Sequence, residues 1–249
     1  MKRSLLIRLA GLAAVLLLLG IVFMSRRSPP PTSEQEPTPG PTIEETAARA
    51  APVVRDIRRN MNHPTRPEHP GPAIHLNTGT IAPDPSDISA LPPVHERPTA
   101  RGYPWMVLFD GPIRPEWRSA LEEAGATIRA VLPVNALLIE APAAALPAIR
   151  RLPSVAWSGE YRPEHKIQRL LGALARQAPD MPVPVTLQTF DPGDAPPLSR
   201  HLRDRGASAI RSTPARRWGL LRAVLPAGRT VELAKLPEVQ WIEYHEPPR

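Results

Sequence analysis

Leu152-Pro153-Ser154-Val155-Ala156-Trp157 and Leu236-Pro237-Glu238-Val239-Gln240-Trp241 are two copies of one pattern, Leu-Pro-x-Val-x-Trp, 84 residues apart. The same offset places Leu137 on Leu221, Pro142 on Pro226 and Ile149 on Leu233. One such hexapeptide can arise by chance, but two that each end a similar pattern indicate an internal duplication. We therefore predict two copies of one small module within residues 103–249.

The first copy reads as strand, helix, strand, strand, helix, strand. Its strands are predicted at 106–109, 127–132 and 136–140, with a turn at 133–135 and a last strand from 155. Two helical stripes lie between them: Trp117, Leu121 and Ala124, then Leu146, Ile149 and Leu152. Gly125 is expected to end the first helix. Val155 and Trp157 alternate along the last strand and are predicted to face the same side.

The second copy follows the same order. Strands are predicted at 183–190, 209–213 and 219–225, and Val239 and Trp241 open the last strand. Asp194 is a predicted N-cap for a helix that carries Leu198 and Leu202 and ends at Gly206. A second helical stripe follows at Thr230, Leu233 and Leu236.

These patterns predict an α+β protein with two tandem ferredoxin-like (β-α-β-β-α-β) modules at 102–167 and 183–249. Residues 168–182 are predicted to be a connecting helix and linker. An apolar stripe that begins at the end of the first module is expected to dock on one module, and its residues are Ile167, Leu170, Leu171 and Leu174. Each sheet is expected to bury one face under its helices, with Trp157 and Trp241 as core anchors. The other face is expected to be exposed, where it can pack on its counterpart or on a partner.

The N-terminal residues 1–27 form a targeting segment. Lys2, Arg3 and Arg8 precede an unbroken apolar run at 9–24, which is typical of a signal peptide or a single membrane anchor. Counted over residues 5–24, the run is long enough to span a bilayer, and the poor cleavage site near Ser25 favours an uncleaved anchor. We expect the body to be extracytoplasmic, either membrane-anchored or secreted.

Residues 28–101 are rich in proline and are predicted to be a largely disordered linker. Residues 43–60 favour a short helix that Pro52 interrupts. His63, His69 and His75 are evenly spaced, but their spacing fits neither a helical face nor a zinc pattern. We interpret them as solvated side chains and predict no metal site.

Composition narrows the classes of function. The net charge is +7, but residues 1–27 hold five positive charges and no acid, so the body is nearly neutral and no nucleic-acid partner is expected. Only three lysines accompany 28 arginines, which we read as coding bias. The absence of cysteine excludes disulfides, thiolate metal sites and a cysteine nucleophile. No cofactor is predicted.

Four stretches resemble a known family. The stretches are Ile74 to Ile81, Met106 to Ile113, Pro133 to Ile139 and Tyr161 to Pro163. They resemble the non-catalytic N-terminal region of a group of secreted subtilisin-like serine proteases, which is similar to the fervidolysin prodomain. The resemblance covers about residues 74–249 and is weaker in the second copy.

The resemblance implies a propeptide role: templating the folding of a subtilisin-like protease and occupying its active-site cleft. By analogy, the C-terminal tail would lie extended in the substrate groove of the partner. Its residues are Tyr244, His245, Glu246, Pro247, Pro248 and Arg249. Against strand pairing there, the two prolines lack N–H donors.

The sequence departs from that family where a catalytic domain would follow. It stops at Arg249 and contains no Gly-x-Ser-x-Gly motif, and His165, His201 and His245 lack a flanking glycine-rich nucleophile loop. We therefore predict no catalytic residues and a protein that is not an enzyme. The leading hypothesis is a prodomain-like protein that binds, chaperones or inhibits a protease or another extracytoplasmic protein.

Two alternatives remain open. Tandem ferredoxin-like modules on a membrane tether also suit an envelope scaffold that oligomerises. The second alternative is that the chain is the N-terminal fragment of a longer subtilisin-like protease. Neither the partner nor the oligomeric state follows from the sequence.

Overall fold

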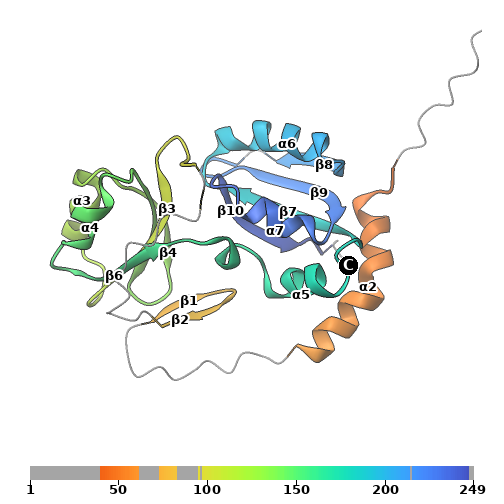
Figure 1. The fold of residues 1–249 in the computed structure, drawn as a ribbon, viewed down its shortest axis with the longest axis horizontal. Coiled ribbons are helices and arrows are strands. Elements are labelled where there is room, and N and C mark those ends of the chain that lie inside the picture. The colour runs from red at the N-terminus through yellow and green to blue at the C-terminus, as the bar shows by residue number, and fades with distance from the viewer. Residues whose placement is uncertain (1–39, 62–72, 83–94, 96, 214, 247–249) are drawn as a thin grey trace, which may run out of the picture. The chain divides into compact units, whose positions relative to one another are not determined.

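The computed structural model describes residues 40–61, 73–82, 95, 97–213 and 215–246. These residues form two four-stranded sheets, a two-stranded hairpin and the helices that pack on them (Figure 1). Every strand pair within the sheets is antiparallel. The predicted combination of helices with antiparallel sheets is therefore confirmed.

The strands of the first sheet do not lie side by side in the order in which they occur in the chain. Its strand order is β4-β5-β3-β6, so the first and third strands of the unit lie in the centre. Helix α3 connects β3 to β4, and helix α4 connects β5 to β6. The elements are β3 Tyr103–Phe109, α3 Pro115–Glu123, β4 Thr127–Leu132, β5 Ala136–Ala141, α4 Leu146–Arg150 and β6 Val155–Glu160.

The second sheet has the same succession of elements and the same relative strand order, β10-β7-β9-β8. A short 3-10 helix, η2 Pro192–Asp194, precedes its first helix. The elements are β7 Pro182–Thr189, α6 Ala195–Asp204, β8 Ser208–Thr213, β9 Leu220–Pro226, α7 Arg229–Ala234 and β10 Val239–Tyr244.

Helices α3 and α6 end in the same way. Gly125 and Gly206 follow them with φ angles of 93° and 81°. The next residue then donates its N–H across the helix end, from Ala126 to the Leu121 carbonyl at 2.9 Å and from Ala207 to the Leu202 carbonyl at 3.0 Å. This is the Schellman motif, which glycine favours because it adopts positive φ without a steric penalty. The predicted stops at Gly125 and Gly206 are confirmed.

The predicted capping role of Asp194 is wrong. Asp194 precedes α6, but its side chain makes no capping hydrogen bond, because its backbone is already helical at φ −80° and ψ −19°. An N-cap side chain reaches the first turn from an extended backbone. Asp191 has that conformation, and its carboxylate accepts from the Gly193 N–H at 2.8 Å.

A β-bulge lies at the start of the last strand in both sheets. In the first, Leu108 pairs with Trp157 whereas the adjacent Phe109 pairs with Val155, so Ala156 is an extra residue. The bulge turns Val155 and Trp157 to opposite faces, and the prediction that they share a face is wrong. The second sheet repeats the irregularity between Val239 and Trp241.

The first sheet buries both of its faces. One face packs under α3 and α4, where Leu121 and Ile149 are fully buried. The opposite face, with Met106, Leu108 and Leu138, is covered by the hairpin of β1 Ile74–Leu76 and β2 Gly79–Ile81 and by Phe190. Trp157 packs on this second face and is only partly buried. It is therefore not an anchor of the core under the helices, and the expected exposed face is wrong for the first sheet.

The second sheet packs its main apolar face against several helices. Val183, Val185 and Leu187 of β7 share one cluster with residues of α6 and α7 and with helix α5 Arg169–Gln177. Leu170, Leu171 and Leu174 of α5 are buried in that cluster, which confirms the predicted apolar stripe. Trp241 is only partly buried, and its Nε1 donates to the carboxylate of Glu243 in the same strand at 3.0 Å. It is therefore not a core anchor either.

Helix α2 Ile43–Asn60 runs through Pro52 without a break, so the predicted interruption is wrong. A proline inside a helix costs roughly 3 kcal/mol. Burial of Ala50, Val54 and Ile57 in the second-sheet cluster offsets that cost, and Pro52 lies on the exposed side. Helix α2 matches the short helix expected at 43–60, whereas the β1–β2 hairpin, which also lies within the predicted linker 28–101, was not predicted.

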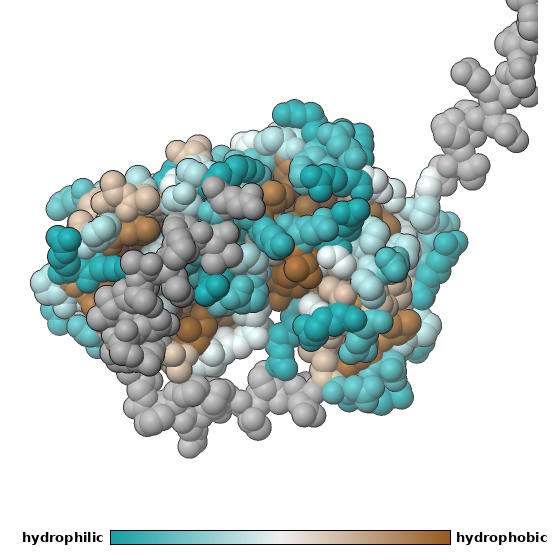
Figure 2. All heavy atoms as spheres, in the orientation of Figure 1, coloured by the Kyte–Doolittle hydropathy of each residue, from teal (hydrophilic) through white to brown (hydrophobic). Residues whose placement is uncertain are grey.

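Polar residues cover the outer sides of the helices. Figure 2 shows hydrophilic residues along the outer surfaces of α2 and α6. Among the described residues, no helix is both long and apolar enough to cross a membrane. Residues 5–24, on which the anchor prediction rests, lie outside the described residues, and the prediction stays open.

Candidate functional site

Residues 161–168 connect the two sheets and contact both. The Tyr161 N–H donates to the Pro104 carbonyl at 3.0 Å in the first sheet. Farther along, Ile242 of β10 donates its N–H to the Lys166 carbonyl at 2.8 Å, and the Gln168 N–H donates back to the Ile242 carbonyl at 2.9 Å. The segment therefore continues the second sheet as a short parallel neighbour of β10.

A buried polar centre lies at this connection. The Nζ of Lys166, which is 0% exposed, lies 2.9 Å from the Nε2 of His95 and donates to the Leu236 carbonyl at 2.9 Å. The Nδ1 of His95 lies 2.5 Å from a carboxylate oxygen of Glu160. Glu160 thus links through the imidazole to Lys166 and so to the end of α7.

Burial controls the protonation of this centre. Burial lowers the pKa of Lys166 to about 7, although Glu238, Glu160 and Glu140 oppose the shift. Burial also lowers the pKa of His95, while its hydrogen bond with Glu160 opposes that shift. A neutral His95 that donates from Nδ1 to Glu160 leaves Nε2 as the acceptor for the amine of Lys166. The contacts are mutually consistent in that tautomer.

Further polar contacts join the two sheets around the centre. Arg97 donates two hydrogen bonds to the carboxylate of Glu238, at 2.8 and 3.0 Å. Arg101 pairs with Asp191 at 2.7 Å, just before α6. The ring of Phe190 meets the edge of Tyr161, with centroids 6.5 Å apart. The junction is therefore fixed by both apolar and charged contacts.

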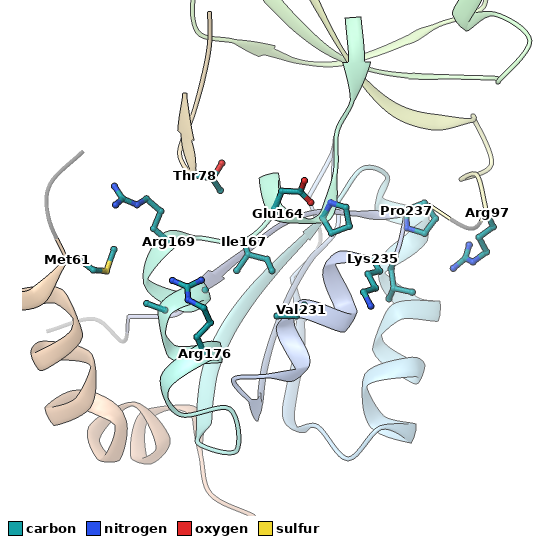
Figure 3. Close-up of a pocket in the computed structure, with 14 residues that line it drawn as sticks. Met61, Thr78, Arg97, Glu164, Ile167, Arg169, Arg176, Val231, Lys235 and Pro237 are labelled. Carbon is teal, nitrogen blue, oxygen red and sulfur yellow. The ribbon is translucent and has the colours of Figure 1, made fainter. Parts of the chain in front are cut away.

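A cavity of about 970 Å³ opens beside the buried centre. We call it the junction groove, and its described lining comes from the end of α2, the β1–β2 turn, η1 Pro163–His165, α5 and α7. In Figure 3, Arg169 and Arg176 extend from α5, Val231 lies on α7, and Ile167 lies between the two helices. Leu236, whose carbonyl binds Lys166, is part of the lining.

The predicted partner-binding tail is divided by the structure. Tyr244 is buried and pairs with Val185, which removes its side chain from the surface, and burial raises its pKa. His245 donates its N–H to the Pro184 carbonyl at 2.9 Å, and Glu246 forms an ion pair with Arg58 of α2. Pro247, Pro248 and Arg249 lie outside the described residues.

The histidines considered from the sequence lie apart. His75 contacts Thr80 across the β1–β2 hairpin at 3.0 Å, and His165 accepts from the Arg162 N–H at 3.1 Å. No group of three potential metal ligands lies together among the described residues. His63 and His69 lie outside those residues.

Sequence reasoning missed His95, Lys166 and the junction groove. One signal was available: Lys166 and Lys235 are two of only three lysines in a chain that uses arginine almost throughout. A lysine amine, unlike a guanidinium, loses its proton when it is buried. The rarity of lysine could therefore have identified Lys166 as a candidate site residue, which the interpretation as coding bias overlooked.

Comparison with known proteins gives one match. Residues 75–162 match the family described as "Domain of unknown function (DUF8729)". That range begins in β1 and ends just after β6, so it covers the hairpin and the first sheet. No curated protein and no solved structure matches the chain. Over its hairpin and first sheet, this chain is thus similar to a family of unknown function.

Proposed function

We propose that this protein is a non-catalytic, prodomain-like binding protein of the cell envelope whose partner is a subtilisin-like protease. It carries two tandem ferredoxin-like modules. The observation that carries the proposal is the repeat: both units have the order β-α-β-β-α-β, with the first and third strands central. The shared Schellman stops and the shared bulge support one module used twice.

The junction supports a role in binding. A prodomain that templates a partner must keep its own shape while the partner folds. A binding surface that has to become ordered on binding loses conformational entropy, and its affinity is lower for that reason. The two modules are held together by the buried contact of Lys166, the part-buried contact of Tyr161 and the exposed contact of Arg97. The pair therefore offers one preorganised surface.

The test uses the purified full chain in mild detergent and a subtilisin-like protease from the same cell envelope. We expect the chain to slow hydrolysis of a chromogenic peptide by the protease and to raise the yield when the denatured protease refolds. A chain that ends at Glu246 separates the two effects. It should keep the chaperone effect and lose the inhibition if Pro247–Arg249 occupy the cleft.

Co-purification supplies the negative outcome. If tagged full chain recovered from envelope extract never enriches a subtilisin-like protease, and purified protease is neither slowed nor refolded better, the proposal fails. If the chain that ends at Glu246 inhibits the protease as well as the full chain does, only the proposed role of the tail is contradicted.

A second candidate function, self-assembly as an envelope scaffold, is favoured by the edge of the first sheet. β4 is an outer strand of that sheet, and its Val131 is 64% exposed. An outer strand with an exposed apolar side chain is a template for pairing with another copy. Light scattering on the full chain should then give a discrete oligomer that Val131→Lys dissociates, whereas a monomer rules the scaffold out.

A further inference from the structure

The junction groove carries an excess of positive charge. Among its described lining residues, Arg97, Arg169, Arg176 and Lys235 are cationic, and Glu164 is the acid. These charges come from four different parts of the chain: the segment before β3, α5, the end of α7 and η1. Their convergence on one cavity is therefore a product of the fold.

Two of the cations are available to a ligand. Arg97 is already paired with Glu238. The side chains of Arg176 and Lys235 are exposed, and within the described part of the chain neither forms a hydrogen bond or an ion pair, although the charge of Lys235 acts on Glu232. Arg176 and Lys235 lie on opposite walls of the groove, on α5 and just after α7 (Figure 3).

Between the charged walls the groove is apolar. Ile167 and Leu236 are partly buried there, and Val231 of α7 is 44% exposed. Gly172 adds no side chain to the α5 wall, and a Cβ built on it would just touch Arg176 and Ile167, at 3.7 and 3.9 Å. The surface therefore combines an apolar base with positive sides.

We propose that the junction groove binds an extended acidic segment of a partner protein, in which carboxylates alternate with apolar side chains. The apolar residues would cover Ile167 and Val231, while the carboxylates pair with Arg176 and Lys235. The inference rests on the proposed function as a partner-binding protein and specifies where the partner is held. The volume, about 970 Å³, suits a peptide segment better than a small anion.

A peptide fits this surface better than a nucleic acid. Single-stranded nucleic acids are held by aromatic side chains that stack on the bases. The described lining of the groove contains none. An apolar base instead matches aliphatic side chains, so nucleic-acid binding is treated as an outcome of the test.

The experiment measures fluorescence anisotropy of a short labelled peptide in which leucine and glutamate alternate, titrated with the full chain in mild detergent. The variant Arg176→Glu with Lys235→Glu reverses both available charges. We expect its affinity to fall about tenfold or more, with weaker binding of the wild type at high salt. The matched control reverses Arg118 and Arg203, which are exposed on α3 and α6 outside the groove, and should bind like the wild type.

Several results would overturn the inference. The first is that the Arg176→Glu, Lys235→Glu variant binds the peptide as tightly as the wild type. The second is that the wild type binds a peptide with lysine in place of glutamate equally well. The third is that it binds a single-stranded oligonucleotide more tightly than the acidic peptide. A Val231→Asp variant gives a second measurement, because it should weaken the peptide through the apolar base. Peptide binding without any effect on a subtilisin-like protease would reject the protease partner and keep the groove. An effect on the protease without peptide binding would reject the groove as the binding site and keep the protease as the partner.

Discussion

The Nζ of Lys166 lies 2.9 Å from the Nε2 of His95, although the two residues are 71 positions apart. The contact joins the segment between the sheets to the residue that lies before the first sheet, and Leu236 extends it to the second. Because both side chains are buried, the proton content of this pair is coupled to the stability of the junction.

Replacement of Lys166 by methionine should make stability less dependent on pH. Burial lowers the pKa of Lys166 from 10.5 to about 7, so the unfolded chain binds one more proton between these values. The free energy of unfolding of the wild type should therefore rise with pH in this window, by at most about 1.4 kcal/mol per pH unit from this group. Lys166→Met removes that contribution.

Urea denaturation followed by tryptophan fluorescence at pH 7 and pH 9.5 checks this. The wild-type advantage over Lys166→Met should grow with pH, because only the wild type gains stability from Lys166 over this range. The variant also loses about 1–3 kcal/mol at both pH values, because the Leu236 carbonyl and His95 are left without the lysine. Burial also lowers the pKa of His95, which makes both proteins less stable in acid. Parallel pH dependences of the two proteins would contradict the assignment.

Glu140→Gln should destabilise the first sheet strongly. Glu140 is 1% exposed and accepts from Arg129 and from the Thr99 hydroxyl. The change leaves the Arg129 charge without a counter-ion at a site where its side chain is 12% exposed, which costs roughly 3 kcal/mol. The control Glu122→Gln, on the exposed side of α3, should change stability by less than about 0.5 kcal/mol. A small effect at Glu140 would mean that the carboxylate is not paired.

Gly159→Ala should disturb the second face of the first sheet. A Cβ at this position would lie 2.3 Å from the Trp157 ring, so the indole must move, at a cost of about 1–3 kcal/mol. Gly111→Ala is the control, since no atom lies within 4 Å of its Cβ position. In a Trp157→Leu background the Gly159→Ala cost should shrink. An unchanged cost would place the conflict elsewhere.

Val134→Asn should stabilise the protein by about 0.5–1 kcal/mol. Val134 has φ 61°, a left-handed conformation that a β-branched residue adopts only with strain and asparagine tolerates better. Its side chain is 51% exposed, so little packing is lost. Val131 is exposed in the extended strand β4 and is the control. Val131→Asn should not stabilise the protein, because asparagine is disfavoured in strands. Thermal unfolding of both variants decides between these outcomes.

Local chemistry explains what could be predicted. The apolar spacing of α3 and α5, the glycines after α3 and α6 and the repeated Leu-Pro-x-Val-x-Trp each act within one helix, turn or strand. Such signals depend on neighbours a few residues away, and the succession of elements in both sheets follows from them. The errors at Trp157 and Pro52 arose where a bulge or a distant packing surface outweighed the local pattern.

The sequence by itself determined the succession of helices and strands within each of the two four-stranded sheets and the positions of the helix stops. Only the tertiary structure decided which face Trp157 takes, that Lys166 is buried against His95, and that Arg176 and Lys235 face one groove. The physical reason is distance along the chain. Backbone preferences act over a few residues, whereas burial, the pKa of a lysine and the convergence of charges depend on segments that meet only when the two sheets pack together.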